Sequence, residues 1–228
     1  LASEFDMKQL GDLKYFLGIK VARSKHGIFL SQRKYILDLL TETRMLGCKP
    51  IDTPIEQNHK NFHCADATST YNGRCQRLVG KLIYLSHTRP SIAYAINVVS
   101  QFMHDSKKLH MDAIEQILRY LKSAHRKGML FSNHGHLKVE DYTDADWAGL
   151  VDNRRSSAGY FTFVGGNLVT WMCKKQQVVA RSSAEAKFRR MANGMCELLW
   201  IKYLLKDIQY KQKDAMKLYC DNKSARDC

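Results

Sequence analysis

The fold of this chain is decided by YTDADWAG at Tyr142–Gly149, RSSAEAKF at Arg181–Phe188 and LYCDNKSA at Leu218–Ala225. Each stretch places acidic residues where a strand or a helix can direct them toward one point. Around these stretches apolar residues first recur at every second position, which is typical of strands, and then at helical spacing. The predicted order is three strands, a long helix and a fourth strand.

Turn signals and periodicity set the expected bounds of these elements. Gly165-Gly166-Asn167 is a strong signal for a hairpin between the second and third strands. The helix is expected from about Ser183 to Ile208, with Phe188 and Leu198 among its apolar residues. The strands are expected at 139–148, 158–164, 168–173 and 216–220.

The sequence pattern in the first half of the chain predicts a mainly helical region. One strand is expected at 13–21, and His26-Gly27 is expected to turn the chain into a second strand. Pro90 suits the first turn of a helix, so a break between helices is expected at 88–90. Apolar stripes predict helices within 32–47, 76–104 and 111–124. The fold class expected for the whole chain is therefore α+β with α/β character.

These patterns divide the chain into four parts. Residues 1–47 combine the short strands with one helix, and residues 76–128 are helical. Between them, residues 48–75 carry two of the three prolines, many polar residues and no period, which predicts a linker. Residues 129–228 hold the predicted sheet and its long helix.

The charge balance favours a polyanionic partner. Lys and Arg together number 36 against 22 Asp and Glu, which leaves a formal net charge of +14. Each phosphate that a protein neutralises releases counterions and adds salt-sensitive affinity, so nucleic acid is the expected partner. The alternative is a soluble protein with an ordinary basic bias. The basic residues expected to follow phosphates are Arg154, Arg155, Lys174, Lys175 and Arg181.

Composition disfavours several other classes of protein. The sequence contains no run of about eighteen apolar residues that would span a membrane, and no secretory signal opens it. The seven cysteines are odd in number and form no C-x-x-C pair, so we expect reduced thiols in the cytoplasm or nucleus and no zinc site. The chain begins with Leu1 rather than Met, which suggests a piece of something longer.

In order and spacing, the acidic segments resemble the ribonuclease H part of copia-type retrotransposon Pol polyproteins. The match includes YTDADWAG, the following VDNRRSSAGYFTFVGGNLVTW (151–171), SSAEA and YCDNKSA. FDMKQLG (5–11) and LKYFLG (13–18) resemble the segment just after the polymerase active site of the same polyproteins. LVGKLIYLSHTRPSIAYAINVVSQF (78–102) resembles the region that connects polymerase and nuclease. The resemblance covers nearly the whole chain.

The resemblance implies a role for each part of the chain. Residues 1–47 would hold a reverse transcriptase primer-grip hairpin and a thumb-like helix. In that hairpin Phe16, Leu17 and Gly18 would help to hold the primer end. Residues 76–128 would be the helical connection. Residues 129–228 would be a partial ribonuclease H-like domain, with a truncated mixed sheet and a long helix. The catalytic strand of the polymerase lies upstream of these segments in the family, so this chain alone is not expected to polymerise DNA.

The same resemblance implies a two-metal nuclease site. Asp144 and Asp221 match the metal ligands of the first and fourth strands, where two Mg²⁺ ions would activate water and stabilise the leaving oxygen. The helix glutamate of the family is replaced by Lys187, a cation that would repel Mg²⁺. Glu185 is not expected to substitute, because its position matches a capping box. Asp146, on the same strand face as Asp144, is either beside the metals or a strand-end polar residue.

The expected substrate is the RNA strand of an RNA–DNA hybrid, which proteins read through shape, phosphates and 2′-hydroxyls. The rest of the Pol polyprotein is the other expected partner. The family supplies its last catalytic acid beyond the position of Cys228, and this together with Lys187 predicts a catalytically impaired chain. Two alternatives to a nuclease stay open: a non-catalytic basic remnant that binds nucleic acid, and a decayed fragment without activity.

Overall fold

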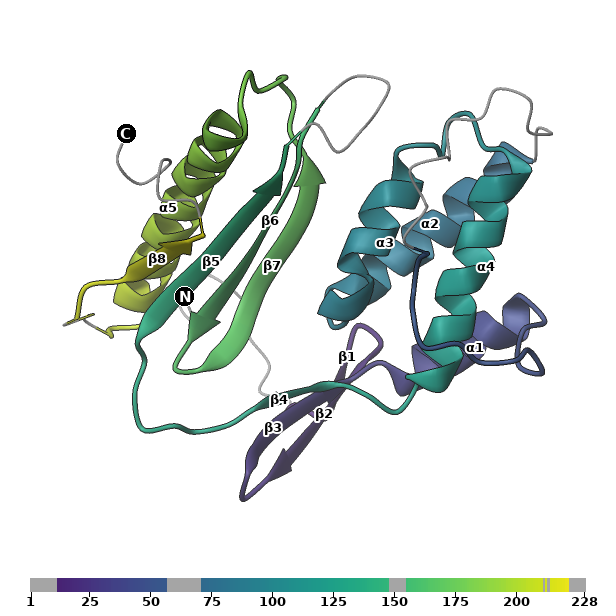
Figure 1. The fold of residues 1–228 in the computed structure, drawn as a ribbon. Coiled ribbons are helices and arrows are strands. Elements are labelled where there is room, and N and C mark those ends of the chain that lie inside the picture. Colours follow the sequence, from purple (N-terminus) through teal and green to yellow (C-terminus); the bar gives the residue numbers. More distant parts are fainter. Residues whose placement is uncertain (1–11, 57–70, 148–154, 211, 213, 222–228) are drawn as a thin grey trace, which may run out of the picture.

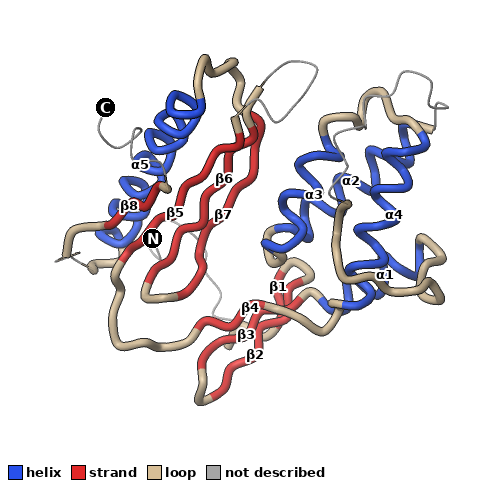
Figure 2. Tube along the Cα trace, viewed as in Figure 1, coloured by secondary structure: helices blue, strands red, loops and turns tan. Residues whose placement is uncertain are grey.

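The computed structural model describes residues 12–56, 71–147, 155–210, 212 and 214–221. A helical bundle stands beside a sheet that carries one long helix, and a smaller sheet lies next to the bundle (Figure 1). Helices and strands are both extensive, as the tube colouring makes plain (Figure 2). The expectation of a chain that mixes helices with sheets is confirmed.

The bundle is held together by the apolar stripes that the sequence predicted. Its helices are α1 (Arg33–Glu42), α2 (Asn72–Ser86), α3 (Pro90–Ser100) and α4 (Lys108–Ser123). Ile36, Leu82 and Ile114 are fully buried in one shared core. Pro90 is in the first turn of α3, as predicted, because a proline there gives up no helical hydrogen bond.

The smaller sheet has the strand order β1-β2-β3-β4. Its strands are β1 (Tyr15–Phe16), β2 (Ile19–Ser24), β3 (Gly27–Ser31) and β4 (Met129–Phe131). The predicted hairpin at His26-Gly27 is confirmed by the pairing of Ser24 with Gly27. The prediction of one strand over 13–21 is wrong, because Leu17 and Gly18 take φ values of 46° and 78° and turn the chain between β1 and β2. A run of apolar residues could not reveal this turn, since leucine residues rarely adopt positive φ.

The larger sheet has the strand order β7-β6-β5-β8, and β8 runs parallel to β5 while the other neighbours are antiparallel. Its strands are β5 (Val139–Asp146), β6 (Ser157–Val164), β7 (Asn167–Lys175) and β8 (Lys217–Cys220). Gly165 and Gly166, with φ of 58° and 74°, make the predicted hairpin between β6 and β7. The long helix α5 (Ser183–Asp207) packs on β5, which confirms the predicted order of strands and helix.

Strand β5 sends alternate side chains to opposite faces of the sheet. Val139, Asp141, Thr143 and Ala145 are buried, and the residues between them are at least partly exposed. Gly194 of α5 lies directly over the buried row, where an added Cβ would be 2.5 Å from Asp141 Oδ2. This close approach fixes how α5 sits on β5.

The bundle and the larger sheet are joined where α3 and the end of α2 meet β7. The indole Nε1 of Trp171 donates a hydrogen bond to the Ser86 carbonyl at 3.1 Å, and Asn97 Nδ2 lies 3.8 Å from Cys173 Sγ. The face of the larger sheet that looks toward α3 forms one wall of a cleft.

Within the described ranges, none of the helices is long and apolar enough to cross a membrane.

Candidate functional site

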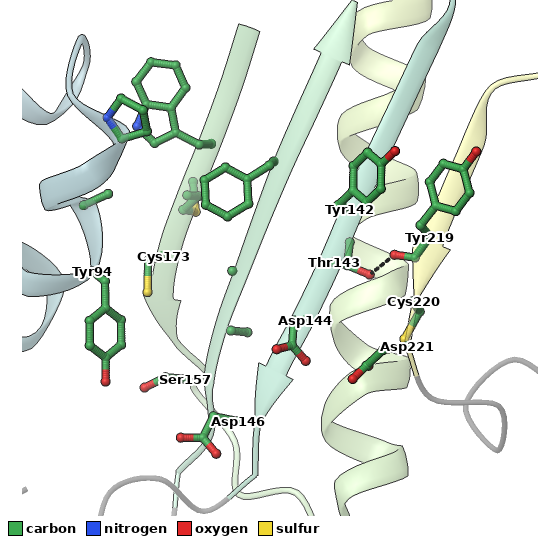
Figure 3. Close-up of a pocket in the computed structure, with 17 residues that line it drawn as sticks. Tyr94, Tyr142, Thr143, Asp144, Asp146, Ser157, Cys173, Tyr219, Cys220 and Asp221 are labelled. Atoms are coloured by element: carbon green, nitrogen blue, oxygen red, sulfur yellow. Dashed lines mark hydrogen bonds between the residues drawn. The ribbon is translucent and has the colours of Figure 1, made fainter. Parts of the chain in front are cut away.

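Asp144 and Asp221 meet where two parallel strands end. In the β5–β8 pairing Tyr142 is opposite Tyr219 and Thr143 is opposite Cys220, so the next position along places Asp144 beside Asp221. Their carboxylates point toward each other from the ends of β5 and β8 (Figure 3). The sequence segments that carry these residues are far apart, and the parallel pairing brings them together.

A pair of tyrosines lies beside the two carboxylates and was missed by the sequence analysis. Tyr142 and Tyr219 are stacked with ring centroids 4.7 Å apart and an interplanar angle of 15°. Each tyrosine is two residues before an aspartate, so both strands carry the pattern Tyr-x-Asp. Because side chains alternate along a strand, this shared pattern was the signal that could have predicted both pairs.

Lys187 lies between the two carboxylates. Its ammonium nitrogen donates to Asp221 Oδ1 at 2.6 Å and lies 3.3 Å from Asp144 Oδ1. The side chain of Lys187 is only 13% exposed, against 73% for Asp144 and 66% for Asp221. The hydrogen bond with Asp221 raises the pKa of Lys187 and lowers that of Asp221. The position that the family resemblance reserves for a metal ligand thus holds a cation.

Glu185 is committed to the start of α5 and does not share in this site. Ser182 Oγ accepts from the Glu185 backbone N–H at 3.1 Å, and Glu185 Oε2 accepts from the Arg181 N–H at 2.7 Å. Arg189, one turn further on, donates to Glu185 Oε1. These bonds lower the pKa of the Glu185 carboxyl, the bond from Arg181 most. The predicted capping role is confirmed, with the N–H of Arg181 in place of that of Ser182.

A cleft of about 610 Å³ opens between α3 and the outer face of the larger sheet. Asp144 and Asp221 lie on its wall together with Asp146, while Tyr94 faces them from α3 (Figure 3). Burial, Cys173 and then Asp146 raise the pKa of the Tyr94 hydroxyl. Asp146 lies in the same cleft as Asp144. The ion pairs of Lys187, however, are formed with Asp144 and Asp221.

Comparison with known proteins places this chain among mobile-element proteins. Residues 1–57 match the family described as reverse transcriptase (RNA-dependent DNA polymerase). Over 99% of its length the chain is 40% identical to the retrovirus-related Pol polyprotein from transposon RE1 of Arabidopsis thaliana. It is 37% identical over its full length to that from transposon TNT 1-94 of Nicotiana tabacum. An uncharacterised mitochondrial protein of Arabidopsis thaliana is 40% identical over 88% of this chain and 83% of its own length.

The chain belongs to the copia-type Pol polyprotein family. It spans 15% of the length of the RE1 polyprotein and 18% of that of TNT 1-94. Among the described residues, this Pol-family chain contains no group of three or more His, Cys, Asp or Glu side chains that could hold a metal ion. Mg²⁺ requires hard oxygen ligands, and an ammonium group 2.6 Å from one of the two carboxylates opposes it. The donor set at Asp144 and Asp221 therefore does not fit the metal that the family resemblance implies.

Basic residues of the Pol-family chain gather at the same end of the larger sheet. Lys175 is opposite Ser157, which in turn is opposite Asp146, so Lys175 lies two strands from the acidic row, about 10 Å away. Lys174 precedes it on β7, and Arg155 and Arg181 lie just before β6 and α5. Arg154 lies outside the described residues. Arg189 on α5 is a further basic residue here, which the sequence analysis did not select.

The predicted primer-end residues do not lie at this end of the larger sheet; they are Phe16, Leu17 and Gly18. They form the turn between β1 and β2, where Phe16 and Leu17 are more than half exposed. A Cβ added at Gly18 would lie 3.5 Å from the hydroxyl of Tyr84 on α2, so this turn lies against the bundle. The structure thus separates the predicted primer-end residues, in the smaller sheet, from the acidic residues of the larger one.

Proposed function

We propose that this chain binds RNA–DNA hybrids at the end of the larger sheet where Asp144 and Asp221 meet, and that it does not cut the RNA strand. The observation that carries the proposal is the Lys187 ammonium held between the two carboxylates. In the same proposal, residues 1–47 are the primer-grip and thumb-like part of a reverse transcriptase. Residues 76–128 are its connection, and residues 129–228 are a partial ribonuclease H-like domain.

Binding is supported by the arrangement of charge. Lys174, Lys175 and Arg155 lie at the sheet end that carries the carboxylates, and the whole chain has a formal net charge of +14. Carboxylates alone would repel the phosphates of a duplex. A cation between them offsets that repulsion without any metal, so phosphates can approach this end of the sheet.

The absence of cutting follows from the chemistry of the same three side chains. Hydrolysis of this kind uses divalent ions, which supply an activated water and stabilise the leaving oxygen. Lys187 occupies the space between the carboxylates, and its ammonium has no lone pair with which to accept a proton from water. Asp144 and Asp221 are thereby engaged in ion pairs instead of holding the ions that would activate water.

Binding is tested by the salt dependence of hybrid affinity. For the Lys174→Ala/Lys175→Ala double variant we expect the slope of log K against log salt to fall by about 2, roughly 1 for each phosphate that is no longer neutralised. The affinity should fall by similar factors for hybrids of different sequence, since phosphates carry no base information. Fluorescence anisotropy of a labelled hybrid at several salt concentrations measures both quantities.

The matched control is Arg126→Ala/Lys127→Ala, which removes two exposed charges from the turn after α4. This control should change the slope much less than the β7 double variant. Equal losses of affinity in the two double variants would mean that the binding depends on net charge alone, and the proposed location would be wrong.

Cleavage is tested by incubating the chain and Asp144→Asn with end-labelled hybrid and Mg²⁺. We expect the RNA strand to stay intact with both proteins while the hybrid stays bound. Cleavage by the starting chain that disappears in Asp144→Asn would reveal a working nuclease and reject this part of the proposal. If the chain neither binds nor cuts, the decayed-fragment alternative stands instead.

A further inference from the structure

The two carboxylates near the strand ends are close enough for a nearby cation to stabilise them. The β5–β8 register makes Asp144 and Asp221 neighbours across adjacent strands, whose backbones lie about 4.8 Å apart. Like charges at this spacing repel each other and weaken the end of the strand pairing. Two-metal nucleases offset such repulsion with divalent cations, but the donor set at Asp144 and Asp221 does not fit divalent cations.

Lys187 is built to supply the missing positive charge from within the chain. Its side chain is 13% exposed, so the methylene stem is packed while the ammonium reaches the carboxylates. The ammonium joins three elements. Lys187 is in the second turn of α5, Asp144 lies two residues before the end of β5, and Asp221 directly follows β8. The contacts to Asp144 and Asp221 are separate ion pairs with one shared nitrogen.

We infer that Lys187 is the resident cation of the Asp144/Asp221 pair, and that it fastens the start of α5 to the ends of β5 and β8 in place of a metal. The inference rests on the same site as the proposed function. It requires no bound nucleic acid, however, and is tested without any. One consequence is that the stability of this chain does not respond to divalent cations. A second is that a glutamate in place of Lys187 would bring a third carboxylate to this pair, and with it the oxygen ligands that a divalent cation needs.

The experiment compares thermal unfolding with and without millimolar Mn²⁺ for the starting chain, Lys187→Met and Lys187→Glu. The starting chain should show the same Tm in both conditions. Lys187→Met should melt about 2 to 4 °C lower, because the carboxylates lose their counter-ion. Lys187→Glu should melt lower still without metal and regain stability with Mn²⁺, because three carboxylates then face one point.

Two matched variants distinguish a Mn²⁺ effect at the Asp144/Asp221 site from a general effect of the charge change. Lys202→Glu makes the same change at an exposed position on the same helix, and its Tm should be insensitive to Mn²⁺. Adding Asp144→Asn to Lys187→Glu should abolish the Mn²⁺ response. A Mn²⁺ response in the starting chain that Asp144→Asn removes would overturn the inference, and so would an unchanged or higher Tm for Lys187→Met.

A measurement on the unaltered chain covers the case in which a variant fails to fold. Lys187 should react with an acetylating reagent more slowly than Lys202, as read by mass spectrometry of the digested protein, since its ammonium is shielded and hydrogen-bonded. Equal reactivity would reject the resident-cation role. If the metal and acetylation results hold while hybrid binding is absent, the proposed function fails and this inference stands.

Discussion

Arg89→Ala is expected to lower the free energy of unfolding by about 3 kcal/mol, the largest effect that we predict for a single substitution in this chain. Arg89 is buried between α3 and α4 and is only 4% exposed. Its guanidinium donates to the carbonyls of Ala124 at 2.8 Å and His125 at 3.3 Å, which follow the end of α4. Alanine would leave both carbonyls without this charged donor and would open a cavity.

The cost of burying the Arg89 charge moderates this loss. Burial removes the guanidinium from water, which disfavours its charge and lowers its pKa. The loss of two charge-assisted bonds at the negative end of a helix nevertheless outweighs the relief of desolvation. Urea unfolding followed by circular dichroism measures the difference in free energy between the two proteins.

Arg77→Ala is the control for Arg89→Ala. The Arg77 side chain is 62% exposed and pairs with Glu42 at 3.2 Å on the bundle surface. Exposed ion pairs contribute about 1 kcal/mol or less, so this variant should stay close to the starting chain. Equal stability losses for the two variants would show that the buried contacts of Arg89 contribute no more to stability than the exposed ion pair of Arg77.

Gly194→Ala is expected to destabilise the chain by about 2 kcal/mol, even though alanine is the better helix former. The new Cβ would lie 2.5 Å from Asp141 Oδ2 and 2.8 Å from Thr143 Cγ2, and both side chains are buried. Helix α5 would have to move away from β5, which would also strain the reach of Lys187 to Asp144. Chemical unfolding gives the stability, and the Lys187 acetylation rate reports the displacement.

The matched substitution Gly80→Ala should have the opposite sign. Gly80 lies in α2, and an added Cβ there would meet nothing within 4 Å. Alanine should therefore stabilise the chain by about 0.5 to 1 kcal/mol through helix propensity and the entropy of the unfolded state. If both alanine variants gain stability, α5 packs less closely on β5 than the structure indicates.

Periodicity and turn chemistry made much of the fold predictable. The alternation along 139–146 and the apolar spacing after Ser183 placed β5 and α5 within a few residues of their observed bounds. Pro90 and Gly165-Gly166 marked a helix start and a hairpin, because their backbone preferences act locally. Local rules failed at Leu17-Gly18, where the chain turns inside an apolar run.

Neighbouring residues were enough to predict the order of strands and helix in the larger sheet, the family resemblance and the replacement of an expected acid by Lys187. The contacts of Lys187 could not be predicted in this way, because they depend on how distant segments pack. The parallel pairing of β8 with β5 sets Asp221 beside Asp144, and the packing of α5 brings the ammonium to both. The physical reason is that ion pairs depend on distance in space, which long-range packing fixes and sequence spacing does not.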